Sequence, residues 1–287
     1  MACIRNIYRC ASPDVIGEKL LANGAESRLE GHASFVFNEV GLVLDLRSPS
    51  ERQELQSQMW MKQANMQVFE THQDYKPTNR RSVVRIDVLS PSRFMTYIEE
   101  NWLTAAEGAQ ATWYKLMDGG KLHELRIERL NERGLAGLNE AILETGKAEL
   151  LRALQTITEH LEVNPGEKAI IHCVQGKDRT GMLVMLLQSI LGVPDAAIVA
   201  DYFQSNQMLD KNEGSAAANE IRPKGRLDRN VFSGTNPEAM IKTLQYLRQK
   251  YGSVSPGYLD AIGFDAKWRK RLVAVLIPDL GPPASRL

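Results

Sequence analysis

The sequence is poor in cysteine, in long apolar runs and in net charge. Its 287 residues include three cysteines, which are too few and too irregularly spaced for a disulfide framework or a zinc site. No apolar stretch reaches the roughly 18 residues that span a membrane, and the N-terminus lacks the apolar core of a signal peptide. Thirty-five basic residues balance thirty-five acidic ones, which argues against a nucleic-acid-binding protein that neutralises phosphates. We therefore expect no metal, no nucleic-acid partner and no integral membrane segment.

The length and composition are those of a chain that buries one sizeable core. Of the 287 residues, 43% are hydrophobic and 24% are charged. A single α/β domain over residues 1–287 that carries an insertion fits these values better than two independent domains do.

The densest chemistry lies in residues 172–181, which read HCVQGKDRTG. The apolar run before them, 169–171, contains two β-branched isoleucines and predicts a short buried strand. The apolar run after them, 182–191, predicts a buried helix that stops at a glycine and a proline. The five residues between Cys173 and Arg179 can therefore turn their backbone N–H groups inward at a helix start. We call residues 173–179 the phosphate loop, because such a loop fits a tetrahedral oxyanion.

The side chains of this stretch divide into roles. Cys173 is a nucleophile stabilised as a thiolate by the helix dipole and by the arginine. Arg179 supplies a planar fork that can hold two phosphoryl oxygens, and Thr180 can give its hydroxyl proton to the departing sulfur. The remaining expected roles are loop orientation by His172 and substrate binding by Val174, Gln175, Gly176 and Lys177. An inert buried cysteine would not need these neighbours in this order.

The full string resembles the loop of the microbial Cys-x5-Arg tyrosine and phosphoinositide phosphatases. The resemblance implies a phosphocysteine mechanism without a cofactor, and substrates that include phosphotyrosine, phosphoserine, phosphothreonine and phosphoinositides. We expect Lys177 to place a second cation at the loop rim, which would suit a multiply phosphorylated inositol ring more than a phosphotyrosine.

A second strand-to-helix junction precedes this loop. Residues 41–47 form an apolar strand pattern that ends in Asp45 and Arg47, and Ser48 and Glu51 have the spacing of a capping box. The string DLRS followed by a glutamate resembles the second signature of the same family. Two interpretations of this string stay open. It could be a functional signature in which Arg47 braces the active-site loop without touching substrate, or Asp45 could simply form a salt bridge with a nearby base at the strand end.

The N-terminal and middle segments complete the sheet. Residues 4–8 are a strand candidate before a helix that starts at Ser12, and we interpret Cys10 between them as structural. Residues 57–82 read as a polar surface excursion, and residues 83–89 as a further strand. Apolar spacing over 135–161 predicts a long helix with a possible bend at Gly146.

Residues 93–134 form the segment that least resembles a minimal phosphatase. Aromatic and aliphatic residues recur there at helical spacing, interrupted by Gly108 and by a glycine pair at 119–120. We interpret the segment as a helical lid that excludes water and selects the substrate. The alternative is that its aromatics form only a small core of their own.

The general acid has two candidates. The loop after the strand 83–89 contains no carboxylate, and Asp87 lies inside that strand pattern. Asp178 lies in the phosphate loop, where a bound phosphate dianion would keep it partly protonated. We therefore favour Asp178, with Asp87 or water as the alternatives.

Together these patterns predict an α/β protein with a central four- or five-stranded, mostly parallel sheet flanked by helices. The expected function is a cysteine-dependent phosphatase that hydrolyses phosphate monoesters of proteins or phosphoinositides. A catalytically inactive phosphate-binding module is the competing function. Because a catalytic thiolate needs reducing surroundings, we expect a cytoplasmic location.

Overall fold

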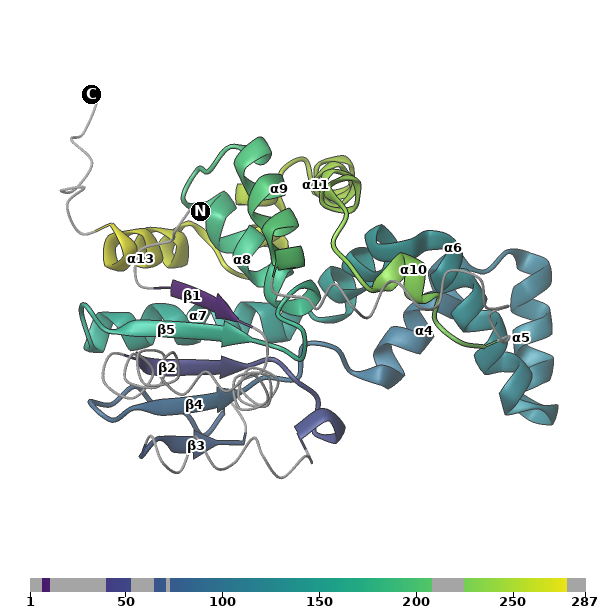
Figure 1. Ribbon diagram of the computed structural model, residues 1–287, viewed down its shortest axis with the longest axis horizontal. Helices are drawn as coiled ribbons and strands as arrows, with labels where there is room; N and C mark the ends of the chain where they lie inside the picture. Colours follow the sequence, from purple (N-terminus) through teal and green to yellow (C-terminus); the bar gives the residue numbers. More distant parts are fainter. Residues whose placement is uncertain (1–6, 11–39, 53–64, 71–72, 208–224, 278–287) are drawn as a thin grey trace.

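The computed structural model describes residues 7–10, 40–52, 65–70, 73–207 and 225–277. Its centre is a five-stranded sheet in the order β1-β5-β2-β4-β3, in which every pair of neighbours is parallel (Figure 1). The strands are β1 Ile7–Cys10, β2 Val40–Asp45, β3 Gln67–Phe69, β4 Ser82–Arg85 and β5 Lys168–His172. The expected α/β architecture with a parallel sheet is confirmed.

The register of the sheet brings three strand ends to one level. His172, the last residue of β5, pairs with Cys10 of β1 on one side and with Asp45 of β2 on the other. Since all five strands run in the same direction, the loops that follow them leave from one edge of the sheet. The phosphate loop and the segment after Asp45 are therefore neighbours.

Three strand predictions need correction. β4 ends at Arg85, so Asp87 lies in the extended segment after the strand and not inside it. β3 falls within residues 57–82, where no strand was expected, because a three-residue edge strand has no visible periodicity. β1, described from Ile7, ends at Cys10 and not at residue 8. Residues 4–6, the side chain of Cys10 and the helix expected from Ser12 lie outside the described residues.

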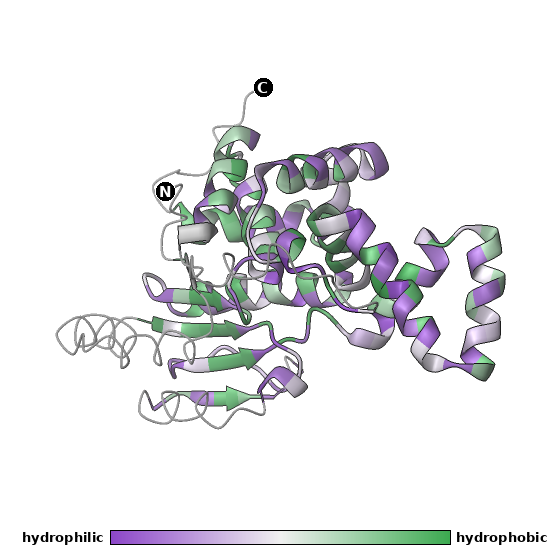
Figure 2. Cartoon of the chain, turned by 45° about the vertical axis from the view of Figure 1, so that its right-hand side comes forward, coloured by the Kyte–Doolittle hydropathy of each residue, from purple (hydrophilic) through white to green (hydrophobic). Residues whose placement is uncertain are grey.

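The helices gather around two places. Figure 1 shows α8, α9, α11 and α13 beside the β1 edge, and α4, α5 and α6 extending beyond the carboxyl ends of the strands. Hydrophobic residues are concentrated in the strands, whereas the extending helices alternate hydrophobic and hydrophilic positions (Figure 2). The bounds of the eight longest helices are α4 Pro91–Trp102, α5 Ala105–Met117, α6 Gly119–Thr145, α7 Lys147–Val163, α8 Asp178–Ile190, α9 Asp195–Phe203, α11 Pro237–Tyr251 and α13 Ala266–Leu276.

Shorter elements connect them. These are the 3-10 turns η1 Ser50–Arg52 and η2 Gln204–Gln207, the helices α10 Arg229–Phe232 and α12 Leu259–Ala261, and the π-helical turn η3 Val254–Tyr258. Within the parts of the chain described above, no helix combines the length and the apolar character needed to cross a bilayer.

Helix α8 carries the phosphate loop into the core. Ten of its thirteen residues are buried, from Arg179 to Gln188. A helix that is apolar on every side is one that neighbours cover completely, and α6, α7, α9 and β5 pack against α8. The start of this helix is therefore held rigidly.

The segment expected as a lid consists of α4, α5 and the first half of α6. Phe94, Ile98 and Trp102 of α4 form a small core with Leu130 and Ala141 of α6. The expected interruptions fall differently, because Gly108 lies inside α5 while the pair at 119–120 begins α6. Gly134 kinks α6 at φ 60° and ψ −155°, a conformation that essentially only glycine adopts.

Helix α5 is the part of this segment that faces solvent. The side chains of Trp113, Leu116 and Met117 are 59%, 79% and 64% exposed. The aromatics of the segment thus divide, since Trp102 belongs to the small core and Trp113 does not. Gly146 separates α6 from α7, at the position where the sequence predicted a bend.

Candidate active site

The phosphate loop begins where β5 ends and closes at the first turn of α8. Cys173 follows His172 directly and is 2% exposed. Gly176 has φ 70°, a left-handed conformation that a residue with a Cβ rarely adopts. That turn directs the Gly176 N–H at the Cys173 Sγ, 3.3 Å away. The predicted strand, loop and helix are confirmed, and the helix starts at Asp178, one residue before the arginine.

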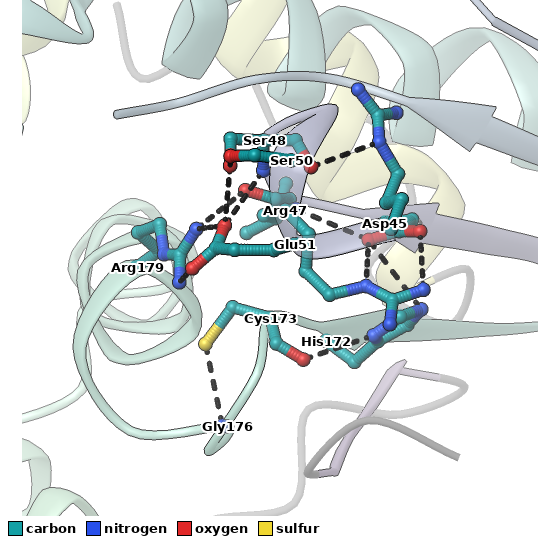
Figure 3. A network of polar contacts seen from close by, with 11 residues as sticks. Asp45, Arg47, Ser48, Ser50, Glu51, His172, Cys173, Gly176 and Arg179 are labelled. Atoms are coloured by element: carbon teal, nitrogen blue, oxygen red, sulfur yellow. Dashed lines mark hydrogen bonds and ion pairs between the residues drawn. The ribbon is translucent and has the colours of Figure 1, made fainter. Parts of the chain in front are cut away.

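Arg179 is held by a glutamate from the β2 side of the sheet. Its Nη1 lies 2.6 Å from Glu51 Oε2 and its Nη2 lies 2.8 Å from Glu51 Oε1 (Figure 3). Nη1 also donates weakly to the Leu46 carbonyl oxygen at 3.4 Å. The Arg179 fork therefore presents its terminal edge to Glu51.

Glu51 is itself fixed by the turn that contains it. Its Oε2 accepts hydrogen bonds from the Ser48 N–H at 2.8 Å and from the Ser48 hydroxyl at 3.0 Å. Burial alone would raise the pKa of Glu51, but the bonds from Arg179 and Ser48 lower it below its usual value. Burial alone would likewise lower the pKa of Arg179, yet the Glu51 carboxylate and the Cys173 sulfur raise it. Both groups therefore stay charged across the neutral range.

Asp45, Arg47 and His172 form a buried support beneath the loop. Arg47 donates from Nε and Nη2 to the two Asp45 oxygens, both at 2.9 Å. Burial would raise the pKa of Asp45, but His172 and Arg47 lower it to about 2. His172 places Nε2 4.0 Å from Asp45 and Nδ1 3.1 Å from the Cys173 carbonyl oxygen. A carbonyl can only accept, so Nδ1 carries the proton of that bond.

This geometry bears on both interpretations of the second signature. Asp45 forms the strand-end salt bridge, and Arg47 uses its fork on Asp45 (Figure 3). The three side chains connect β2 to β5 just behind Cys173, which fits a bracing role.

The predicted substrate-binding residues do not all point the same way. Val174 is half-buried and Gln175 is exposed. Thr180 is fully buried, and its hydroxyl has no hydrogen-bond partner among the described residues. Lys177 was expected at the loop rim, but its side chain is 1% exposed because the carbonyl oxygens of Phe232 and Gly234 bind its ammonium.

Asp178 lies at the first position of α8, beside Arg179. Its Oδ2 is 3.9 Å from Lys177 Nζ, whereas its Oδ1 is buried without a hydrogen-bond partner in the described part of the chain. Burial raises the pKa of Asp178 above its usual value, although Lys177 and Arg179 act in the opposite direction. Asp87 also has a buried Oδ1 with no partner in those residues, but it lies two residues beyond β4.

Glu51 is the residue of this site for which no functional role was predicted from the sequence. Its spacing from Ser48 marked it only as part of a capping box. The sequence feature that could have pointed to a functional role is the position of Glu51, four residues after Arg47 in the second signature. In the described residues, no group of three or more histidine, cysteine, aspartate or glutamate side chains could hold a metal ion.

Comparisons with known proteins agree with this geometry. The model of the tyrosine phosphatase family matches residues 23–278. Over 139 residues the chain is 31% identical to the triple specificity protein phosphatase PtpB of Mycobacterium tuberculosis. This match covers 44% of this chain and 49% of that protein. Over 169 residues the chain is 28% identical to "Putative tyrosine-protein phosphatase H16_A0669" of Cupriavidus necator. This match covers 57% of this chain and 55% of that protein.

The matches thus span about half the length of these curated relatives. The family model covers most of the chain, including both signatures and the phosphate loop. The resemblance expected from the loop sequence is confirmed: the chain belongs to the tyrosine phosphatase family.

Proposed function

We propose that the protein is a cysteine-dependent phosphatase that hydrolyses phosphate monoesters through a phosphocysteine intermediate. The observation that carries this proposal is the position of Cys173 at the base of the loop, with Arg179 fixed by Glu51 at its end. Family membership supports the same chemistry.

The free edge of Arg179 is the proposed contact for the phosphoryl group. A guanidinium has five N–H donors in a planar fork. Glu51 and Leu46 take both donors of Nη1 and one of Nη2. No acceptor among the described residues takes Nε–H or the second Nη2–H, and this parallel pair can hold two phosphoryl oxygens. Arg179 can therefore bind Glu51 and substrate at the same time.

The reaction has two displacements. In the first, Cys173 Sγ attacks phosphorus, the ester P–O bond breaks, and Asp178 gives its proton to the leaving oxygen. In the second, water attacks phosphorus and the P–S bond breaks, while the ionised Asp178 accepts a proton from the water. The Thr180 hydroxyl is buried beside the loop and would stabilise the departing sulfur.

Lys177 was expected at the loop rim as the argument for a multiply phosphorylated substrate, but its side chain is buried. The proposed substrate class therefore rests on the relatives and on the family. The name of the mycobacterial relative, a triple specificity protein phosphatase, supports phosphorylated proteins as substrates. Phosphoinositides remain within the proposal as the second substrate class. A phosphate-binding module without catalysis would not need an acid with a raised pKa beside the nucleophile.

We extend the proposal to the whole chain. Residues 1–287 form one phosphatase domain, and the insertion at 93–134 acts as a lid through the exposed face of α5. The catalytic thiol requires reducing surroundings, so a cytoplasmic location fits the chemistry.

Release of inorganic phosphate from p-nitrophenyl phosphate tests the proposal. The protein should hydrolyse this ester without added metal, and Cys173→Ser should lose turnover while it retains binding of inorganic phosphate. The serine hydroxyl is not ionised at neutral pH, whereas the loop amides stay in place. Turnover by Cys173→Ser at the wild-type rate would refute the mechanism.

A further inference from the structure

Lys177 is the most unusual cation near the phosphate loop. Its side chain is 1% exposed and is among the largest that are fully buried in the described chain. Lysine is almost never buried completely unless partners satisfy it. Here Nζ donates to the Gly234 carbonyl oxygen at 3.0 Å and to the Phe232 carbonyl oxygen.

One acceptor, Phe232, is the last residue of α10, and the other, Gly234, lies in the turn between α10 and α11. The two acceptors lie 55 and 57 residues beyond Lys177 in the chain. A compact ammonium on a flexible stem can serve two carbonyls that point from different directions, which a planar guanidinium cannot do with the same geometry. The contact therefore joins the phosphate loop to the backbone of a distant segment.

The segment that receives Lys177 is fixed on its other sides. Asn131 of α6 accepts from the Asp228 N–H at 2.8 Å and donates to the Arg226 carbonyl oxygen at 3.0 Å. Thr235 donates to the carbonyl oxygen of Phe203, the last residue of α9, at 3.3 Å. The Phe232 side chain packs against the small core of α4 and α6. The tether of Lys177 thus leads to helices on two sides of the loop.

We propose that Lys177 is a positioning residue, whose ammonium ties the phosphate loop to residues 232–234, and not a contact for a second substrate phosphate. The proposal rests on the phosphatase activity proposed above. To reach a second phosphate, Nζ would have to leave its own buried place and deprive two partly buried carbonyl oxygens of their donor, which is costly. Holding Nζ in place instead fixes the loop amides and the adjacent Asp178 in the geometry that the reaction needs.

The position of the ammonium also affects the acid. Nζ lies 3.9 Å from Asp178 Oδ2, and its charge lowers the pKa of Asp178 against the larger effect of burial. Removing the charge should therefore raise that pKa and keep Asp178 protonated to higher pH. This response distinguishes Lys177 from a residue that only adds stability.

The test compares Lys177→Met with Lys177→Arg on two substrates. Methionine keeps a flexible apolar stem without charge or donors, and arginine keeps the charge. On p-nitrophenyl phosphate and on a short-chain phosphoinositide bisphosphate, Lys177→Met should lower kcat about 10-fold or more by the same factor, with KM nearly unchanged. On the phosphoinositide, whose leaving alcohol needs a proton, the basic pH limb of Lys177→Met should move to higher pH, whereas Lys177→Arg should lower kcat without moving that limb. Lys242→Met, at an exposed lysine of α11, is the matched control and should behave as wild type.

Hydrogen exchange supplies a measurement that does not need turnover. Amides of residues 229–236 should exchange faster in Lys177→Met and Lys177→Arg than in the wild type. A rise in KM for the phosphoinositide alone, or unchanged kinetics and exchange, would overturn the proposal. Should Lys177→Met fail to fold, Lys177→Arg carries the test alone. A wild-type protein inactive on both substrates would refute the proposed function, while the exchange data would still test the tether.

Discussion

At the residue scale, Glu51 decides which edge of Arg179 faces the phosphate loop. The two residues are 128 positions apart, and their contact is bidentate. Arginine side chains lose considerable conformational freedom when held in one geometry. Glu51, held by Ser48, already orders the Arg179 guanidinium in the folded protein. Substrate binding therefore does not lose that conformational entropy a second time.

Glu51→Gln should lower kcat/KM roughly 10- to 100-fold, because the amide keeps the shape but loses the charge and one of the two accepting oxygens. Steady-state kinetics on p-nitrophenyl phosphate measures the effect. Glu162→Gln, which breaks an exposed ion pair with Arg271, is the matched control. Equal activity of the two variants would show that Arg179 does not depend on Glu51.

Asp178→Asn should slow esters of poorly leaving alcohols far more than aryl esters, whose phenol needs no proton. The acid works while Asp178 is protonated, so wild-type activity should fall as pH rises through its raised pKa. The variant should lack that basic limb. An equal loss on both classes of ester would move the role to Asp87 or to water.

The same substitution has a predictable effect on stability. A carboxyl whose pKa is raised on folding stabilises the protein below its unfolded pKa and loses this contribution as pH rises through the folded value. At pH 7 the buried Asp178 therefore opposes folding, and Asp178→Asn should raise the melting temperature. The gain should shrink toward pH 4, which thermal unfolding at the two pH values would reveal.

The residues that could be found from sequence are those whose partners are close along the chain. Cys173, Arg179 and Thr180 lie within one loop and helix start, so local spacing was enough to find them. The salt bridge of Asp45 is also local, because Arg47 is two residues away. Glu51 and the tether of Lys177 were not predictable, because their partners are 128 and about 55 residues distant.

At the scale of elements, the feature that stands apart is the apolar face of α5. Trp113, Leu116 and Met117 lie at helical spacing and are all more than half exposed. An isolated apolar face on a surface helix commonly marks a contact that forms at another moment or with another molecule. In the proposed lid, that contact forms when the helix closes over the loop.

Replacing Trp113, Leu116 and Met117 with serine should speed alkylation of Cys173 by iodoacetamide several-fold and broaden substrate choice. Their exposure means that the change should affect stability little. Val163→Ser, at an exposed residue that ends α7, serves as the control. If alkylation rate and selectivity match those of the control, the segment 93–134 serves packing only.

Elements with strong periodicity were predictable, and short ones were not. β5, α7 and α8 follow the apolar runs that predicted them, because each is covered on most sides. β3 has three residues, of which two are exposed, so burial left no pattern in its sequence. β4 stops at Arg85 although the apolar alternation continues to residue 89, because the pairing with β2 ends at Arg85 while Ile86 and Val88 stay buried.

At the scale of the whole molecule, the parallel sheet concentrates the chemistry at one edge. The loops after β2 and β5 supply Glu51 and Cys173, and helix α8 supplies Arg179. The α/β architecture was predictable from the alternation of strands and helices along the chain. The strand order was not, because pairing depends on contacts between residues far apart in sequence.

That strand order determines when the strands can pair while the chain is being synthesised. β5 comes last of the five strands in the chain, yet it lies between β1 and β2. Chains emerge from the ribosome N-terminus first, so β1 has no neighbour to pair with until β5 has been made. The reactive thiol is the next residue to follow, and the carbonyls that hold Lys177 come later still. Cys173 can therefore reach its place beside the sheet only after all five described strands have been synthesised.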